Sequence, residues 1–280
     1  MIKSIFMQPY RFIVRQKESY GYWDEGSDNA TALLFLHGML GDIRNWQDNV
    51  LPFTESGYRV IAPILPCYHL PLRQTHIKGL VEWVHGFLDA IGLPKKLILV
   101  GNSLGGQVSM FYSRSYPRDV SGMVLSGSAG IRELAMKSEF FRRNDDEFLR
   151  THAGFTFHNA EKHVTPELME EMKGIISNRE QALRLIAMGR SSKSDTVCPF
   201  LAHLQMPTLL LWGEQDRLTQ PDVAEELHAH LPNSTLRFIP ECGHAPMMEQ
   251  PTLFNEALLE WLHEQFPVSE KERVIETIVV

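Results

Sequence analysis

The sequence predicts an α/β fold: a mostly parallel eight-stranded sheet flanked by helices, with an inserted helical cap. Two observations lead to this prediction. Short runs of buried-strand residues alternate with helix-forming segments along most of the 280 residues, and such alternation is typical of parallel strands joined by right-handed crossovers. Several of these runs also end in a glycine turn that carries a serine, an acid or a histidine. The length suits one large α/β domain better than two independent cores.

The expected strands are short apolar runs bounded by glycine, proline or charged residues. The segments before residue 31 are expected to form an antiparallel start of the sheet, and the later ones its parallel part. The predicted strands are 10–16, 19–24, 31–36, 58–62, 96–101, 121–127, 207–212 and 235–239. Helix-forming residues predict helices over 106–116, 161–173, 179–188 and 252–265.

The stretch 97–106 predicts a catalytic nucleophile. A buried strand stops at Gly101 and delivers Ser103 into a Gly-x-Ser-x-Gly turn, with a helix-forming segment after it. A serine on such a sharp turn needs small neighbours, so Gly101 and Gly105 let the backbone pass closely while the hydroxyl projects outward. The short pattern alone is weak, because it also arises by chance. The strand before it and the helix after it strengthen the interpretation.

A serine hydroxyl needs a neighbouring base and an acid that orients this base. The predicted strand 207–212 runs into a glycine turn that places Asp216 just beyond its carboxyl end. The strand 235–239 leads into a loop that presents His244. The chain order of serine, aspartate and histidine is one of three orders known for serine hydrolases. The predicted triad is therefore Ser103, Asp216 and His244.

An oxyanion hole is expected from two main-chain N–H groups, one directly after the nucleophile and one from the loop after an earlier strand. These are the N–H groups of Leu104 and Met39. The glycines in the His-Gly-Met-Leu-Gly loop, which follows the strand 31–36, let it turn inward. We interpret His37 as a residue that fixes this loop by hydrogen bonds rather than as a second base.

Four motifs in this order resemble those of the α/β-hydrolase superfamily: His-Gly-x-x-Gly, Gly-x-Ser-x-Gly, the strand-end Gly-x-x-Asp and the Gly-His loop. The resemblance covers the chain from about Phe12 to Phe266 and is far more specific than any single motif. It implies the same triad and the same oxyanion donors. The loop from Pro63 to His69 departs from the family pattern, which often has an Asp-x-x-Gly-x-Gly type sequence there. We expect this departure to reshape the pocket entrance rather than the chemistry.

The segment 129–200 is too long for a simple crossover and is rich in helix formers, so it predicts the cap. The core is then expected to comprise residues 1–128 and 201–280. Apolar residues of the cap are candidates to line a substrate site, although most are expected to pack the cap on the core. They are Phe140, Phe141, Phe148, Phe155, Phe157, Met169, Met172, Ile186 and Met188.

Composition limits the function classes. The formal net charge of -7 argues against nucleic-acid binding, which requires a concentrated basic face. No secretory signal or transmembrane run is evident, and three cysteines without metal spacing fit a cytoplasmic protein. The remaining histidines form no metal constellation, so neither a metal nor a cofactor is expected. The segment from Glu270 to Val280 is interpreted as an added strand, a self-association element that could form a homo-oligomer, or a frayed tail.

The leading functional hypothesis is hydrolysis of a small or medium carboxylic ester, the least demanding substrate for this machinery. The alternative within the resemblance is hydrolysis of carbon–carbon bonds in ring-fission products of aromatic catabolism, where asparagine often precedes the serine, as Asn102 does here. Against that alternative, the oxyanion loop lacks an extended glycine run, and Ala245 stands where those enzymes have an aromatic residue. Two further hypotheses are a receptor on a hydrolase fold and an acyl transfer to peroxide or an alcohol.

Overall fold

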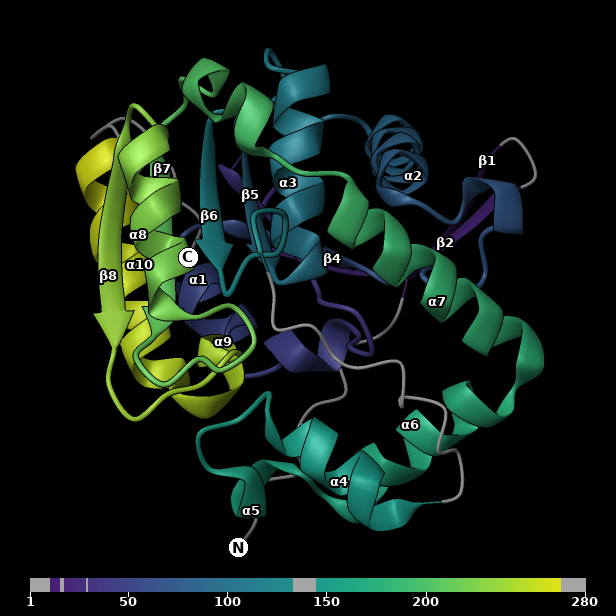
Figure 1. Ribbon diagram of the computed structural model, residues 1–280. Coiled ribbons are helices and arrows are strands. Elements are labelled where there is room, and N and C mark those ends of the chain that lie inside the picture. The colour runs from purple at the N-terminus through teal and green to yellow at the C-terminus, as the bar shows by residue number, and fades with distance from the viewer. Residues whose placement is uncertain (1–10, 16–17, 29, 133–144, 268–280) are drawn as a thin grey trace, which may run out of the picture.

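The computed structural model describes residues 11–15, 18–28, 30–132 and 145–267, and shows the predicted eight-stranded sheet (Figure 1). All eight predicted strands are confirmed, with ends shifted by at most one residue. The strands are β1 (Arg11–Arg15), β2 (Glu18–Glu25), β3 (Ala32–Leu36), β4 (Arg59–Pro63), β5 (Leu97–Asn102), β6 (Gly122–Ser126), β7 (Thr208–Gly213) and β8 (Ser234–Ile239).

The sheet has the order β1-β2-β4-β3-β5-β6-β7-β8. β1 pairs antiparallel with β2, and β2 pairs antiparallel with β4, which confirms the antiparallel start. All other neighbours are parallel, so the carboxyl ends of β3 to β8 lie at one edge of the sheet. Ligands of open α/β sheets bind at this edge, and it carries the predicted site residues.

Helices cover both faces of the sheet. They are α1 (Val50–Glu55), α2 (Ile77–Ile91), α3 (Leu104–Ser115), α4 (Asp146–Gly154), α5 (Ala160–His163), α6 (Pro166–Ser177), α7 (Arg179–Ser194), α8 (Pro221–His230), α9 (Pro246–Glu249) and α10 (Pro251–Gln265). Short 3-10 helices are η1 (Ile43–Trp46), η2 (Leu72–Gln74) and η4 (Cys198–His203).

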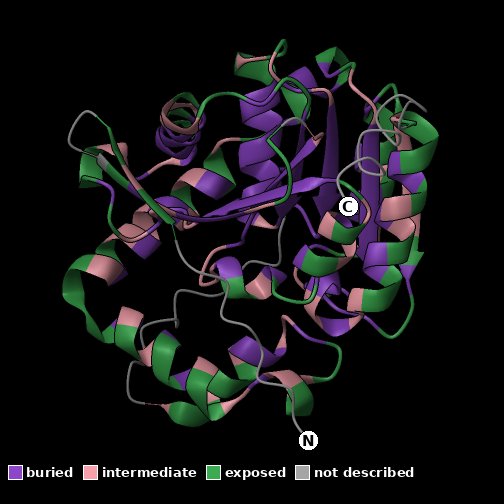
Figure 2. Ribbon diagram, turned by 180° about the vertical axis from the view of Figure 1, so that it is seen from behind, coloured by how far each residue is buried: buried purple, intermediate pink, exposed green. Residues whose placement is uncertain are grey.

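Alternate residues of each strand face different helices, because successive side chains point to opposite faces of a sheet. Leu34 and Leu36 of β3 belong to an apolar cluster with α2, α3 and α8. Leu33 and Phe35 of the same strand belong to a second cluster with α1 and α10. The parallel strands are therefore buried on both sides, as Figure 2 shows. Such double burial explains their nearly continuous apolar sequences.

The helix predictions were correct in type but not always in extent. The predicted helix 161–173 is wrong as one element, because the chain breaks between α5 and α6. Thr165 caps the new helix by accepting a hydrogen bond from Leu168 N–H, and Pro166 occupies its first turn. A proline in this position cannot continue a preceding helix. The helix after Ser103 begins at Leu104 rather than Gly106, and α7 continues to Ser194.

The helices α4 to α7, which we call the inserted helices, lie beyond the carboxyl edge of the sheet (Figure 1). Figure 2 shows their outer faces largely exposed. Phe157, Met169, Met172 and Met188 are buried in the apolar clusters, which confirms packing for these four residues. Phe140 and Phe141 lie outside the described residues. The division into a core of 1–128 and 201–280 and a cap of 129–200 stays a prediction.

Hydrogen bonds join the chain segments that lead into and out of the inserted helices. Val197 N–H donates to the Gly130 carbonyl over 2.9 Å. The side chain of Gln107, fully buried on α3, donates to the carbonyls of Ser192 and Asp195 at the end of α7. The helix that follows the predicted nucleophile is therefore bonded directly to the end of the insertion.

A buried ion pair joins the antiparallel part of the sheet to its parallel part. Asp24 of β2 accepts two hydrogen bonds of 2.8 Å from the Arg59 guanidinium of β4. Only 5% of Asp24 and 8% of Arg59 is exposed. The hydrogen bonds that Arg59 donates to Asp24 raise the pKa of Arg59, and burial opposes this shift.

Among the described residues, no helix is both long and apolar enough to cross a membrane. The predictions for Glu270 to Val280, including its role in a homo-oligomer, fall outside the part of the chain that the structure describes.

Candidate active site

Ser103 occupies a strained turn between β5 and α3. Its backbone angles are φ 53° and ψ -118°, a region that residues other than glycine rarely adopt. A β-carbon on Gly101 would lie 2.4 Å from the Gly105 carbonyl oxygen, and one on Gly105 would lie 2.1 Å from the Leu36 carbonyl oxygen. The turn therefore requires glycine at both positions. This geometry is the one expected for a nucleophile elbow.

Asp216 and His244 are brought together at the same edge of the sheet. The Nδ1 atom of His244 lies 2.9 Å from Oδ2 of Asp216, and both side chains are almost completely buried. Because the carboxylate accepts the Nδ1 proton, Nε2 is the ring atom available to take a proton from a nucleophile. The pair thus has the arrangement of a base with its orienting acid.

The Asp216 carboxylate is held by its own loop. Its Oδ1 atom accepts hydrogen bonds from the N–H groups of Leu218 and Thr219. The Thr219 hydroxyl donates to Oδ2 over 2.9 Å, and the hydroxyl oxygen lies 3.2 Å from Nδ1 of His244. The threonine hydroxyl therefore contacts both members of the pair. Sequence reasoning missed this contact, although Thr219 stands only three residues after the acid.

Two contacts join the serine turn to the histidine loop. The Asn102 side chain donates to the carbonyls of His244 and Ser126, over 2.9 Å and 3.0 Å. Gly127, at φ 53°, lies so close to His244 that a β-carbon there would be 2.9 Å from Nδ1. The structure thus brings Ser103, Asp216 and His244 to one edge of the sheet. Their catalytic roles stay a prediction.

The loop that carries Met39 lies against the serine. A β-carbon on Gly38 would be 3.1 Å from Cβ of Ser103. Within the described residues, the N–H groups of Met39 and Leu104 donate to no protein acceptor. Two unbonded N–H groups beside a strained serine fit the geometry of an oxyanion hole. Their assignment as oxyanion donors likewise stays a prediction.

His37 fixes this loop, as interpreted from the sequence. Its Nε2 atom accepts a hydrogen bond from Leu65 N–H over 2.9 Å, so its Nδ1 carries the proton and donates to the Gly38 carbonyl over 2.8 Å. Complete burial lowers the pKa of His37, while the bond to Gly38 and the charge of Asp42 oppose the shift. The folded protein therefore favours a neutral His37.

This burial predicts a specific pH dependence of stability. Since burial holds the folded-state pKa of His37 below the unfolded value of about 6.5, the unfolded chain binds this proton at a higher pH than the folded protein does. The contribution is complete above pH 6.5 and decreases by at most about 1.4 kcal/mol per pH unit below it. Urea unfolding from pH 7.5 to 5 is expected to give a shallower pH slope for His37→Gln than for wild type. Equal slopes would contradict the prediction.

The segment between α4 and α5 forms hydrogen bonds with the loops that carry Asp216 and His244. The Arg217 guanidinium, next to the acid, donates to the carbonyls of Gly154 and Phe157. The main-chain N–H of His244 donates to the Thr156 carbonyl over 2.8 Å. The segment between α4 and α5 therefore contacts both loops that position the predicted catalytic pair.

The Glu249 side chain adds further hydrogen bonds between this segment and the loop that carries His244. Its carboxylate accepts hydrogen bonds from the N–H groups of Gly243 and His158, over 2.8 Å and 2.7 Å. Burial raises the pKa of Glu249, and these main-chain bonds oppose the shift. Burial also raises the pKa of the neighbouring Cys242 thiol, so this thiol is a packed side chain rather than a reactive one.

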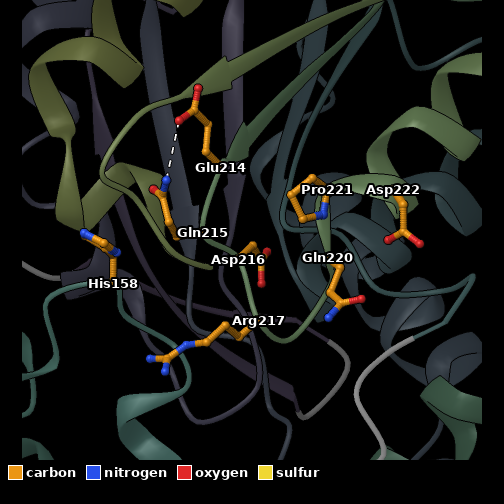
Figure 3. Close-up of a pocket in the computed structure, with 8 residues that line it drawn as sticks. All are labelled: His158, Glu214, Gln215, Asp216, Arg217, Gln220, Pro221 and Asp222. Carbon is orange, nitrogen blue, oxygen red and sulfur yellow. Dashed lines mark hydrogen bonds between the residues drawn. The ribbon is translucent and has the colours of Figure 1, made fainter.

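A surface hollow of about 620 Å³ borders the acid loop (Figure 3). Its lining consists of residues 214–217 and 220–222 together with His158. Neither Ser103 nor the predicted oxyanion donors line it. No group of three or more metal-binding side chains occurs among the residues in the described ranges.

This geometry and the family comparison agree. Residues 31–251 match the family model for the α/β hydrolase fold, which covers most of the chain. The chain belongs to the α/β-hydrolase family, an enzyme family, and the resemblance drawn from the four motifs is confirmed.

Individual relatives catalyse different reactions. The chain is 28% identical over 251 residues to 2-hydroxy-6-oxo-6-phenylhexa-2,4-dienoate hydrolase from Burkholderia cepacia, covering 82% of this chain and 87% of that one. It is 23% identical to Lipase 1 from Psychrobacter immobilis, covering 81% of this chain and 75% of the lipase. A solved α/β hydrolase from the metagenome of Mar Chica lagoon sediments, in Morocco, is 28% identical, with a TM-score of 0.73 and coverage of 91% and 99%.

Proposed function

We propose that this hydrolase cleaves small or medium carboxylic esters through an acyl-enzyme on Ser103. The observation that carries the proposal is the strained Ser103 turn at the same sheet edge as the hydrogen-bonded Asp216–His244 pair. A backbone strain of this kind costs about 1–3 kcal/mol and is retained where function depends on it.

In the proposed mechanism, Ser103 Oγ attacks the ester carbonyl carbon while His244 Nε2 takes the hydroxyl proton. The N–H groups of Met39 and Leu104 bind the resulting oxyanion. His244 then returns the proton to the departing alkoxide, which leaves as an alcohol and forms the acyl-enzyme. Water gives a proton to His244 and attacks the acyl carbon, and His244 then returns that proton to the departing Ser103 Oγ, which releases the carboxylic acid and restores the serine hydroxyl. Asp216 keeps the imidazole in the required tautomer.

The surroundings of the serine favour an apolar acyl group. Met39 and Tyr68 are partly buried and pack against both apolar clusters of the protein. The second of these clusters includes Phe157, Met169 and Met172 of the insertion. An apolar acyl chain gains free energy by leaving water for such surroundings.

Carbon–carbon bond hydrolysis is the second candidate, favoured by Asn102 and by the similarity to the Burkholderia enzyme. It uses the same nucleophile on a ketone carbon. The position after His244 argues for the ester instead, because it holds a small residue, Ala245, buried with 2% exposure. The ester is therefore the first choice of substrate class.

The test combines covalent labelling with two substrate classes. A fluorophosphonate probe is expected to label wild type, with the adduct mapped to Ser103 by peptide mass spectrometry, and to leave Ser103→Ala unlabelled. Ser113→Ala is the matched control, because this serine lies on α3, the helix that Ser103 precedes, and among the described residues its hydroxyl donates only to the Met123 sulfur. This variant is expected to label like wild type.

Substrate turnover then separates the two candidates. Hydrolysis of p-nitrophenyl acetate, butyrate and octanoate is expected at higher kcat/KM than cleavage of a 2-hydroxy-6-oxohexa-2,4-dienoate. The reverse order would replace the ester proposal by the carbon–carbon one. Absence of labelling at Ser103 would reject both.

A further inference from the structure

The loop between β4 and η2 contains the segment that departs from the family pattern. It contacts the 37–41 loop, which carries the predicted oxyanion donor Met39. Pro63 ends β4, and the chain turns at Pro66, whose carbonyl accepts hydrogen bonds from the N–H groups of His69 and Leu70. This turn places Tyr68 against the 37–41 loop. The Tyr68 hydroxyl oxygen accepts a hydrogen bond from Leu40 N–H over 2.5 Å.

Leu40 is held in an unusual conformation. It has φ 62°, in the left-handed region that glycine prefers. A leucine in this region is strained and persists only where its surroundings determine it. The bond to Tyr68 is one such constraint. Burial raises the pKa of Tyr68, so the hydroxyl stays neutral and able to accept this bond.

Two peptide groups flank the α-carbon of Met39, and each is bonded to a different side chain. The peptide between Gly38 and Met39 is fixed at its carbonyl, which accepts from His37 Nδ1 and from Gly41 N–H. Since the described peptide bonds are all trans, the Met39 N–H points away from those donors. The peptide between Met39 and Leu40 is fixed at its N–H by Tyr68.

The loop that carries Tyr68 is itself anchored. Leu65 N–H donates to His37, so the same loop holds both flanking peptides. The Arg184 guanidinium of α7 donates to the Leu70 carbonyl over 2.8 Å. The bond to Leu40 therefore comes from a loop that is attached to the inserted helices.

We propose that Tyr68 is a positioning residue that orients the Met39 N–H toward the oxyanion by holding Leu40 in its left-handed conformation. The inference rests on the proposed function, because it assigns a role in the same acyl-transfer site. The unusual loop sequence thus acts on the chemistry, contrary to the expectation that it reshapes only the pocket entrance.

The test removes only the hydroxyl group. Tyr68→Phe is expected to lower kcat for an ester about 10-fold, less than the 10²–10³-fold typical of losing an oxyanion donor outright, with KM changed less than about 2-fold. The ratio of kcat for an ester to kcat for its thionoester analogue is expected to fall by a similar factor. Sulfur accepts hydrogen bonds weakly, so the thionoester depends less on the oriented N–H.

Tyr58→Phe is the matched control. Tyr58 is buried, and its hydroxyl has no hydrogen-bond partner among the described residues. This variant is expected to keep the wild-type kcat and the wild-type ratio. Circular dichroism verifies that both variants are folded.

The outcomes separate this inference from the proposed function. The rate of fluorophosphonate labelling at Ser103 is expected to fall about 10-fold in Tyr68→Phe, because the phosphoryl oxygen occupies the same oxyanion site. Labelling and turnover equal to wild type would overturn the role of Tyr68 and leave the proposed function intact. A fall in kcat without a change in the thionoester ratio would also overturn it. A wild-type protein that is not labelled would overturn both.

Discussion

Replacement of Ser103 by alanine is expected to lower kcat for an ester on the order of 10⁵–10⁶-fold, because it removes the hydroxyl group that we propose as the nucleophile at the strained turn. Ser103→Gly is expected to be equally inactive. Steady-state kinetics, with a detection limit below 10⁻⁶ of the wild-type kcat, measures this loss.

The same two variants are expected to differ in stability. Glycine adopts φ 53° and ψ -118° without the steric conflict of a β-carbon, whereas alanine keeps that conflict. Ser103→Gly should therefore be more stable than Ser103→Ala by about 1 kcal/mol, or a Tm about 2 °C higher. Equal Tm values would contradict strain at this residue. Residual kcat within 100-fold of wild type would contradict its role as nucleophile.

The second large effect concerns stability alone. Asp24→Asn is expected to lower the free energy of unfolding by about 3–5 kcal/mol, because the variant removes the buried carboxylate that accepts two hydrogen bonds from Arg59 and leaves only the exposed Asp28 carboxylate beside the guanidinium. Denaturant unfolding at pH 7 measures the loss. The kcat of the folded fraction should stay at the wild-type value, since the pair lies between β2 and β4, away from the site residues.

A second variant isolates the unpaired charge as the cause. Asp24→Leu combined with Arg59→Met removes both charges, and it is expected to recover most of the stability lost in Asp24→Asn. If the double variant is no more stable than the single one, the loss comes from packing and not from the buried guanidinium. Asp42→Asn is a surface control, because its partner Arg44 is about half exposed. Its effect should stay below about 1 kcal/mol.

The strands were predictable from the sequence because they are buried on both faces. Residues 97–100 form a continuous apolar run because α3 packs on one side of β5 and the second apolar cluster, which includes residues of α1 and α10, covers the other. The break before α6 was missed because helix-forming side chains continue past Pro166, and the capping bond of Thr165 outweighs their propensity. The helix α2 was not assigned at all, although eight of its residues are buried.

The site was predictable where it depends on neighbours in the chain. The glycines around Ser103 and the strand-end positions of Asp216 and His244 are local features. Asn102 and Glu249 act through contacts that only the folded chain creates, as does Thr219 in its contact with His244; Glu249 reaches His158, 91 residues away. Tyr68 likewise contacts Leu40 across 28 residues. No pattern of neighbouring residues in the sequence predicts hydrogen bonds between residues so far apart.

The hydrogen bonds between residues 154–159 and the loops of the acid and base have a consequence for protein engineering. Exchanging the whole insertion for that of another hydrolase, in order to alter selectivity, would also exchange the acceptors that hold Arg217 and the His244 main chain. A graft that keeps residues 154–159 and α7 and replaces only α6 leaves those acceptors in place, together with the hydrogen bonds from α7 to the Leu70 loop and from Gln107 to the end of α7. The part of the insertion open to exchange is therefore its middle, whereas both of its ends are bonded to the loops around the predicted site.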